Sequence, residues 1–254
     1  MTEGVERAKA PGQAARPAPP RHVAIIMDGN RRWAKARLMP GIWGHRAGVN
    51  AVRNAVQAAG ELGIKWLTLY SFSSENWNRP AEEVDGLMGL LRRFINEDLE
   101  KLHAKGVRVR VIGSREMVAG DIVDLISKAE ALTRDNTALN LMIAFNYGGQ
   151  DEIVDAARAI AREVAEGRLA PEAITRATIE QFLQTSGAPH PDLVIRTSGE
   201  KRLSNFLIWQ SAYAELVFVD ELWPDFTKAT LEAALGEYHR RDRRFGADGP
   251  ERQP

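Results

Sequence analysis

Residue types that bind phosphate and metal follow three short apolar runs of this sequence. In the first case, Asp28 comes directly after the run 23–27 and leads into Gly29 and two arginines. A glycine turn that enters a helical stretch frees backbone N–H groups, and arginine offers forked donors that match phosphate. Asp28 is suited instead to holding a divalent cation. The alternative is that Asp28 and Gly29 simply form a turn, although a helix rather than a second strand is expected to follow. The segment is not a known nucleotide-binding loop, because the sequence contains neither a Walker motif nor a Gly-x-Gly-x-x-Gly motif.

The second segment, 73–80, follows the run 66–72 and holds hydroxyl, amide, indole and guanidinium groups. Capping of the next helix by Asn78 or Ser74 would explain part of this pattern. Capping does not require an arginine such as Arg79 beside them. We therefore interpret the segment as a ligand-binding loop.

The third segment follows the run 193–196 and combines Arg196 and Arg202 with a glycine and hydroxyl side chains. The alternative is a solvated loop whose arginines pair with Glu200 and Asp192. Three such segments at the ends of successive strands would place their donors at one edge of a parallel sheet, where ligands of such sheets bind. The hydroxyl residues of this loop are Ser198 and Ser204.

The elements that must position these loops alternate along the chain. Several apolar runs are continuous rather than alternating, which is typical of strands buried on both faces. Alternating strands and amphipathic helices predict a single α/β domain with a mostly parallel central sheet flanked by helices. The expected strands are 23–27, 66–72, 107–112, 139–145, 193–196 and 216–219. The expected helices are 45–62, 80–105, 120–134, 148–166, 175–184 and 227–243.

The stretch 80–105 gives the clearest helix signal. Pro80 suits the first helical position, acidic residues follow it, and Gly106 is a stop signal. Its apolar residues, Leu91 among them, recur at three- and four-residue spacings. Such a wide apolar face is most simply core, but it could also line a tunnel for an apolar ligand.

Charge and composition exclude several classes of protein. The 34 basic and 34 acidic side chains balance, which argues against a broad basic face that coats nucleic acid. No cysteine is present, so a disulfide framework, a thiolate nucleophile and a zinc ribbon are excluded. The acidic start lacks the apolar core of a signal peptide, and we expect a cytoplasmic protein. We expect a disordered leader over 1–21, one domain over 22–246 and a frayed end over 247–254.

Two isolated residues have a functional and an ordinary interpretation. His45 opens a helix and could bind phosphate, or simply cap or pack. Glu215 lies in an apolar stretch and needs a partner, which could be a salt bridge, a metal or a water. The sequence therefore suits a reaction that displaces diphosphate from an apolar organic group. Such a reaction would use a carboxylate that can hold a metal, arginines, hydroxyl groups and apolar walls.

Long motifs in this order resemble the cis-prenyltransferase family, and within it the bacterial undecaprenyl diphosphate synthases. The resemblance runs from about His22 to Gly246. It is carried by the segments 22–33, 72–80, 146–149 and 192–206, with Trp209, Gln210 and Glu215. It implies a Mg²⁺-dependent enzyme that condenses isopentenyl diphosphate onto an allylic diphosphate, usually farnesyl diphosphate, with undecaprenyl diphosphate (C55) as the expected product.

The resemblance also implies roles for individual residues. Asp28 would be the catalytic carboxylate that is linked to magnesium. Glu215 would complete the group of polar residues on the metal side of the site. The proton acceptor could be Asp28, a phosphate oxygen of the ligand or a relay through Ser73 and Asn76. The residues expected around the allylic diphosphate are Gly29, Asn30, Arg31, Arg32, Trp33 and His45. The loop expected to order over the substrates holds Ser73, Asn76, Trp77 and Arg79, and the expected isopentenyl diphosphate clamp is Arg196, Arg202 and Ser204.

Two departures from the family pattern concern the diphosphate and metal sites. Gly41 stands where many relatives carry arginine, so that contact would be missing or supplied by Arg31 or Arg37. Lys201 stands where some relatives have histidine, which disfavours a metal-ligand role at that position.

The resemblance extends to chain length and partners. Leu139, with Leu91, would lie near the floor of the tunnel, so Leu139→Ala is expected to lengthen the product. A homodimer is expected, with 206–209 and 216–219 as interface segments, and membrane contact would be peripheral and limited to product release. The alternatives are a cis-prenyl product of another length and a non-catalytic partner subunit.

Overall fold

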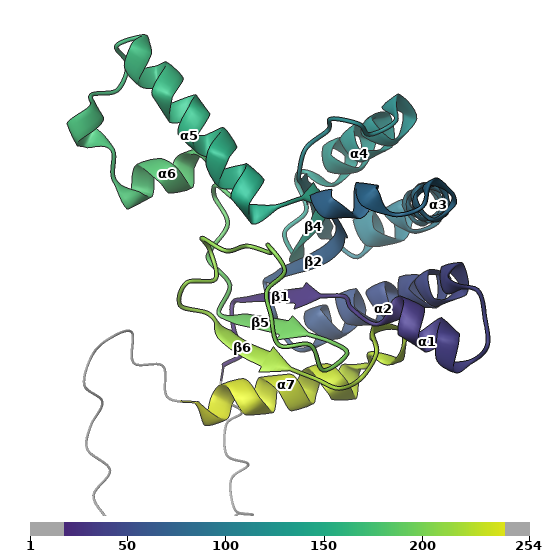
Figure 1. Ribbon diagram of the computed structural model, residues 1–254. Coiled ribbons are helices and arrows are strands. Elements are labelled where there is room, and N and C mark those ends of the chain that lie inside the picture. Colours follow the sequence, from purple (N-terminus) through teal and green to yellow (C-terminus); the bar gives the residue numbers. More distant parts are fainter. Residues whose placement is uncertain (1–17, 242–254) are drawn as a thin grey trace, which may run out of the picture.

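A six-stranded sheet, parallel throughout, forms the centre of the molecule in the computed structural model, which describes residues 18–241 (Figure 1). The strand order is β3-β4-β2-β1-β5-β6. The strands are β1 His22–Ile26, β2 Trp66–Ser73, β3 Val107–Ile112, β4 Leu139–Tyr147, β5 Leu193–Arg196 and β6 Glu215–Phe218. The predicted α/β class and parallel sheet are confirmed, and β1 and β5 are buried along their full length.

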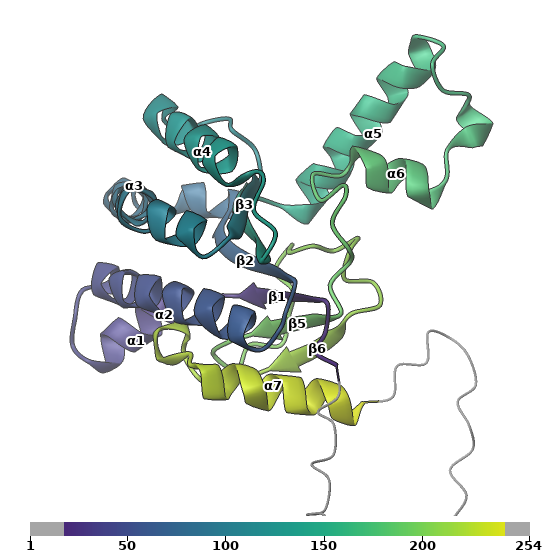
Figure 2. The ribbon, with the colours of Figure 1, turned by 180° about the vertical axis from the view of Figure 1, so that it is seen from behind.

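Helices cover one face of this sheet, as Figures 1 and 2 show from opposite sides. The exception is an arm of two helices, α5 and α6, that projects away from the sheet and packs mainly on itself. The helices are α1 Asn30–Ala36, α2 Gly41–Glu61, α3 Ala81–Ala104, α4 Gly120–Thr133, α5 Gly149–Ala165, α6 Arg176–Phe182 and α7 Lys228–Arg240. Each predicted helix is present, with ends that differ by a few residues; Pro80 precedes α3 rather than beginning it.

Two apolar clusters pack on the two faces of the sheet. Strand residues such as Ile25 and Leu141 face the covering helices. The opposite face is covered by Phe206 and Leu207, which are fully buried within the chain. The expectation that 206–209 forms a subunit interface is therefore wrong for these two residues, because the chain itself buries them.

The N-terminal boundary of the ordered domain also differs from expectation. Arg21 donates its backbone N–H to Asp192 at 2.8 Å, and its carbonyl accepts from Lys65 and Trp66. Residues 18–21 are thus part of the fold rather than of a leader. The remainder of the predicted leader and the predicted frayed end lie outside the described residues. Between residues 18 and 241, no helix combines the length and apolar character needed to cross a bilayer.

Candidate active site

Asp28 lies at the carboxyl end of β1, at the point where the chain turns into α1. Its Oδ2 accepts a hydrogen bond from Arg196 Nη2 at 2.8 Å, and its Oδ1 accepts from the Gly29 backbone N–H at 2.7 Å. Gly29 has φ +104°, and a Cβ there would lie 2.9 Å from a methyl group of Leu222. The turn that presents Asp28 therefore requires glycine on both conformational and steric grounds.

The Asp28 carboxylate is stabilised as an anion. Burial by itself would raise its pKa, but the hydrogen bond and charge of Arg196, with Gly29 N–H and Arg32, hold the pKa below its usual value. Thr197 fixes the backbone of Asp28 from the other side, because its hydroxyl accepts from Asp28 N and donates to Asp28 O. A charged carboxylate is thus fixed at the sheet edge at neutral pH.

Arginines from two strand ends converge on Asp28, as the sequence predicted. Arg196 Nη1 donates to Ser204 Oγ at 2.7 Å and to the carbonyl of Arg202. Arg32 donates to Ser198 Oγ and lies 3.7 Å from Asp28. The first and third loops therefore form one basic, hydroxyl-rich pocket rim. The Arg202 side chain forms an ion pair with Glu200, which also pairs with Arg32.

A second cationic cluster surrounds Glu83 at the start of α3. Arg79 lies 3.1 Å, His45 3.7 Å and Arg31 3.9 Å from its carboxylate. Burial, and then the charge of Arg79, lower the pKa of His45 to about 4, so this imidazole is neutral at pH 7. Its buried Nε2 has no hydrogen-bond partner in the described chain, and the buried Oδ1 of Asn30 has none either. Unpaired buried polar atoms of this kind are suited to contact a polar ligand.

The substitution at position 41 has a direct structural consequence. A Cβ on Gly41 would lie 3.8 Å from Cγ of Arg31, so the Arg31 side chain occupies the space beside this position. Arg37 instead pairs with Asp225 and lies over the ring of Trp33. Of the two candidates, Arg31 is the one placed in the Glu83 cluster. Trp33 points its indole N–H to Asp225 as well, away from Asp28.

The loop after β2 is held in a 3-10 turn, Ser74–Asn78, by its own side chains. Ser73 Oγ caps the turn, and Asn76 Oδ1 accepts from the Ser73 backbone N–H at 3.2 Å. The expectation that Ser74 or Asn78 caps α3 is wrong, because α3 has no side-chain cap. Trp77 donates to Asn146 Oδ1 at 2.8 Å.

α2 approaches the active-site turn through two glycines. A Cβ on Gly44 would lie 1.9 Å from the Asn30 carbonyl oxygen, and one on Gly48 would lie 2.4 Å from Asn30 Oδ1. No side chain fits at Gly44 beside the Asn30 main chain, and a side chain at Gly48 would displace the Asn30 side chain. The close approach fixes the first residue of α1 against α2.

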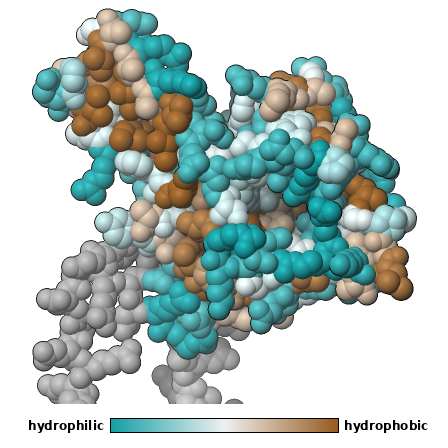
Figure 3. All heavy atoms as spheres, viewed as in Figure 1, coloured by the Kyte–Doolittle hydropathy of each residue, from teal (hydrophilic) through white to brown (hydrophobic). Residues whose placement is uncertain are grey.

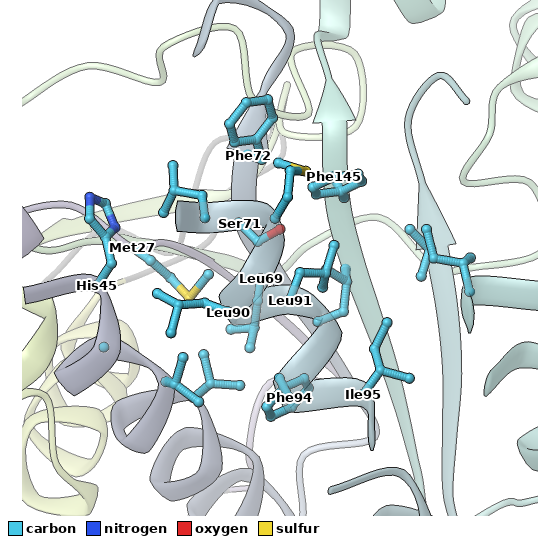
Figure 4. A pocket seen from close by; sticks show the side chains of 18 of the residues that line it. Met27, His45, Leu69, Ser71, Phe72, Leu90, Leu91, Phe94, Ile95 and Phe145 are labelled. Atoms are coloured by element: carbon cyan, nitrogen blue, oxygen red, sulfur yellow. The ribbon is translucent and has the colours of Figure 1, made fainter. Parts of the chain in front are cut away.

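An apolar cavity opens beside these groups, between the sheet and helices α2, α3 and α4 (Figure 4). Its volume is about 160 Å³, and Met27, Asn30 and His45 are among its lining residues. Apolar side chains make up most of the wall, including Leu91, Phe94, Ile95, Val109, Ile143 and Phe145. Leu139 does not line it: this side chain is buried in the core at the amino end of β4. The cavity wall therefore contains Leu91 but not Leu139.

Glu215 does not join Asp28 within one chain. It begins β6 and pairs in register with Leu193, at the level of Val23 on β1. Asp28 is five residues further along, about 16 Å away at roughly 3.3 Å per residue. Glu215 is instead paired with Arg241 at 3.0 Å. The shared metal site expected from the sequence is therefore not formed by a single chain.

The donor set near Asp28 suits magnesium. Within residues 18–241 there is no group of three or more histidine or carboxylate side chains that could hold a metal. Mg²⁺ commonly uses one or two carboxylates, substrate phosphates and water rather than a full protein cage. Asp28 beside a rim of arginines and hydroxyl groups fits that pattern.

Three contributors were not singled out by sequence. Thr197 and Glu83 have the contacts described above; Glu83 was interpreted only as a charge at a helix start. Asn146 holds Trp77 and donates to the carbonyls of Ser114 and Glu116. Asn146 has φ +50°, a left-handed conformation that is unusual for a residue other than glycine, at the end of β4. In the sequence, only its place in the 146–149 motif pointed to it.

Comparison with known proteins decides the family. The family model described as "Putative undecaprenyl diphosphate synthase" matches residues 26–246. The chain belongs to the undecaprenyl diphosphate synthase family of cis-prenyltransferases.

Similar members of this cis-prenyltransferase family include bacterial and plant proteins. The chain is 57% identical to isoprenyl transferase 2 of Bradyrhizobium diazoefficiens, over 96% of this chain and 94% of that protein. It is 59% identical to the isoprenyl transferase of Agrobacterium fabrum, over 90% and 92% of the two chains. Lavandulyl diphosphate synthase from Lavandula x intermedia, crystallised with dimethylallyl diphosphate, superposes with a TM-score of 0.88 at 42% identity, covering 90% of this chain and 99% of that one. The chain is thus a cis-prenyltransferase in fold and in enzyme class.

Proposed function

We propose that this cis-prenyltransferase adds isopentenyl diphosphate repeatedly to farnesyl diphosphate, with Mg²⁺, to give undecaprenyl diphosphate in the cytoplasm. The observation that carries the proposal is the Asp28–Arg196 pair, with the neighbours of Asp28 in the chain, Met27 and Asn30, lining an apolar cavity. A charged rim beside an apolar cavity is suited to a ligand with a diphosphate head and a hydrocarbon tail.

Each cationic cluster would bind one diphosphate. Arg31, Arg79 and His45 would take the allylic diphosphate, which would replace Glu83 as the partner of these side chains. Arg196, Arg202 and Ser204 would take isopentenyl diphosphate. Arg196 already donates to Ser204, so its guanidinium is oriented before substrate binds, and little ordering is needed at that moment.

Asp28, which lies beside Arg196 and Arg32, would hold the metal. Bound Mg²⁺ neutralises negative charge that develops on the leaving diphosphate. Arginine donors at the rim stabilise the same charge, and the apolar wall excludes water from the allylic carbon. The low pKa of Asp28 makes this carboxylate a weak base, and the Ser73–Asn76 pair is engaged in its capping box. These facts favour a phosphate oxygen of the ligand as the proton acceptor.

A different product length is the second candidate, and two observations favour it. The cavity of about 160 Å³ is only about five times the ~30 Å³ that one water occupies in the liquid, which is far too small for a C55 chain. Lavandulyl diphosphate synthase, with 42% identity, is named for a different product. A C55 chain therefore requires α2 and α3 to move apart as it grows. A non-catalytic partner subunit is disfavoured because Asp28, Arg196 and Ser204 are all present and joined.

We also propose that the enzyme is a homodimer that pairs through the α5–α6 arm. Figure 3 shows hydrophobic residues gathered on this arm, and Val154 and Ile174 are exposed there. The arm makes few contacts with its own sheet, so a second copy would supply the missing apolar partner.

The direct test is a product assay. Purified protein is incubated with farnesyl diphosphate, labelled isopentenyl diphosphate and Mg²⁺, and the product is sized by chromatography. A C55 product supports the proposal, another cis-prenyl length supports the second candidate, and no product supports the non-catalytic alternative.

Asp28→Asn serves as the inactive reference in this assay. We expect a rate loss of about 10²–10³-fold, the usual cost of removing one electrostatic stabiliser. Asp121→Asn is the matched control, because Asp121 is an exposed carboxylate paired with Arg92, and its rate should match wild type. Equal rates for the two variants would remove Asp28 from the mechanism.

A further inference from the structure

Four large apolar side chains are exposed together where α1 leads into α2. They are Leu38, Met39, Ile42 and Trp43, and we call them the apolar tip. Leu38 is 97% exposed and Trp43 48% exposed. The four make up half of the eight large apolar side chains exposed in the described part of the chain. Figure 1 shows the α1–α2 connection on the side of the molecule away from the α5–α6 arm.

The backbone holds Leu38 outward. Its φ is +56°, a left-handed conformation that favours glycine at the end of a helix. Its N–H donates to the Lys35 carbonyl at 3.1 Å, and Met39 N–H donates to the Ala34 carbonyl at 2.9 Å. A glycine would adopt this conformation without strain, yet the chain presents an exposed leucine.

Cationic side chains surround the apolar tip. Lys35, Arg37, Arg46 and Arg93 are all exposed. Arg37 pairs with Asp225, and Arg93 lies 4.0 Å from Glu97. Lys35 and Arg46 form no ion pair within the described residues, and the Arg46 guanidinium lies 5.2 Å from the ring centroid of Trp43. The rim is therefore net positive.

The apolar tip adjoins the seam between α2 and α3. Ile42 and Trp43 line an outer groove together with Leu90 of α3. Leu90 also lines the inner apolar cavity, so the cavity and the groove share this side chain as part of their walls. A hydrocarbon chain that leaves between α2 and α3 would emerge beside the apolar tip.

We propose that the apolar tip and its cationic rim dock the enzyme on an anionic lipid bilayer, with the α2–α3 seam facing the lipid. Apolar side chains beside lysine and arginine are the composition that binds such interfaces. A second copy of the chain is a poor occupant, because pairing two tips would bring like charges together. The use of this surface for product release rests on the proposed function; the docking itself does not.

Site-specific fluorescence tests the docking without substrate. The natural chain has no cysteine, so Leu38→Cys gives a single site for an environment-sensitive dye. Met117→Cys is the matched control, since Met117 is also exposed, non-helical and at positive φ. With vesicles of phosphatidylcholine and phosphatidylglycerol, we expect a blue shift and a severalfold rise in emission at position 38 and no change at position 117.

Two variant pairs separate the apolar and the charge contributions in vesicle flotation. Leu38→Ser with Trp43→Ser, which leaves the charge unchanged, should weaken binding to anionic vesicles about tenfold or more, because two apolar contacts are lost. Lys35→Gln with Arg46→Gln should lower it roughly tenfold, while binding to purely zwitterionic vesicles stays unchanged.

No response at position 38, equal responses at 38 and 117, or equal binding to both kinds of vesicle would overturn the proposal. So would a response that depends on protein concentration without vesicles, which would assign the surface to self-association. An enzyme that forms no polyprenyl product but still shows the vesicle response would fail the proposed function and leave the docking intact.

Discussion

Asp28 and Arg196 come from different strands, and their pairing sets the charge of the site. Each restrains the other: Arg196 lowers the pKa of Asp28 against the effect of burial, and Asp28 helps orient a guanidinium that also binds Ser204. Arg196 Nε is buried without a hydrogen-bond partner in the described chain. One further acceptor can therefore be bound there without displacing an existing contact.

At the same scale, His22 predicts how stability depends on pH. Its Nδ1 lies 2.7 Å from the Pro189 carbonyl and must donate to it, so Nε2 accepts from the Thr68 hydroxyl. Burial lowers the pKa of His22 from 6.5 to about 4. As pH falls below about 6.5, the unfolded chain binds a proton that the folded chain does not, so stability falls, by up to about 3 kcal/mol by pH 4.

Urea unfolding at pH 7, 5.5 and 4.5 checks this prediction. His22→Gln should reduce the loss of unfolding free energy between pH 7 and 4.5, because it removes the buried imidazole that resists protonation. His45, whose pKa is also lowered to about 4, should account for part of the remaining slope. An identical slope in wild type and His22→Gln would contradict the assignment.

At the scale of elements, the leucines Leu91 of α3 and Leu139 of β4 lie at different places relative to the cavity. Leu91 on α3 lines the cavity, and Leu139 lies in the core at the start of β4. Val109, which lines the cavity, is two residues along β3 from Val107, the register partner of Leu139. Leu139 thus lies beyond the cavity floor.

Truncating these leucines should therefore change product length in different ways. Leu91→Ala widens the existing wall, and Leu139→Ala opens new space beyond the floor; each should shift the product toward longer chains. Leu139→Ala should also cost about 2–5 kcal/mol of stability, as buried leucine truncations do, and Leu91→Ala should cost less, because Leu91 is only partly buried. Product sizing and urea unfolding measure both effects.

Leu193→Ala is the control for this pair. It removes the same side chain from the core of β5 but does not border the cavity, so it should destabilise the protein without changing product length. If Leu139→Ala matched this control, Leu139 would have no role in chain length.

The elements also show why part of the site could be predicted from sequence. Apolar runs on consecutive positions marked the buried strands, and the rule that ligands gather at the carboxyl ends brought Asp28 and Arg196 together. The same rule places Glu215 at the opposite edge of the sheet from Asp28, because Glu215 comes before its apolar run and so lies at the amino end of the strand. The packing of Phe206 on the other face of the sheet could not be predicted in this way. A loop lacks the regular spacing of apolar residues that shows which face of a helix or strand is buried.

At the scale of the whole molecule, helices bury one face of the sheet while α5 and α6 extend from it (Figure 2). Val154 and Ile174 on this arm are exposed, and the proposed homodimer would bury them. The tip and the arm lie on different sides of the molecule, so dimer formation through the arm leaves the apolar tip accessible.

Sedimentation velocity tests the dimer. Wild type should sediment as a dimer at micromolar concentration, and Val154→Arg with Ile174→Arg should shift it to monomer, because buried unpaired charges cost several kcal/mol. Leu38→Arg, at the exposed tip on the other side of the molecule from the arm, should remain dimeric. A wild-type monomer, or a dimer unaffected by the arm variants, would contradict the proposal.

The close approach of α2 to Asn30 has a consequence for how the sequence can vary. A Cβ on Gly44 would lie too close to the main-chain oxygen of Asn30, and a Cβ on Gly48 would lie too close to the side-chain oxygen of Asn30. A side chain at Gly44 must push the Asn30 main chain outward and, with it, the turn that carries Asp28, whereas a side chain at Gly48 must displace the Asn30 side chain and crowd the ring of Trp223. In a survey of all single substitutions, Gly44 should therefore be as intolerant as Asp28, and Gly48 should tolerate few replacements, although their own atoms carry no chemistry.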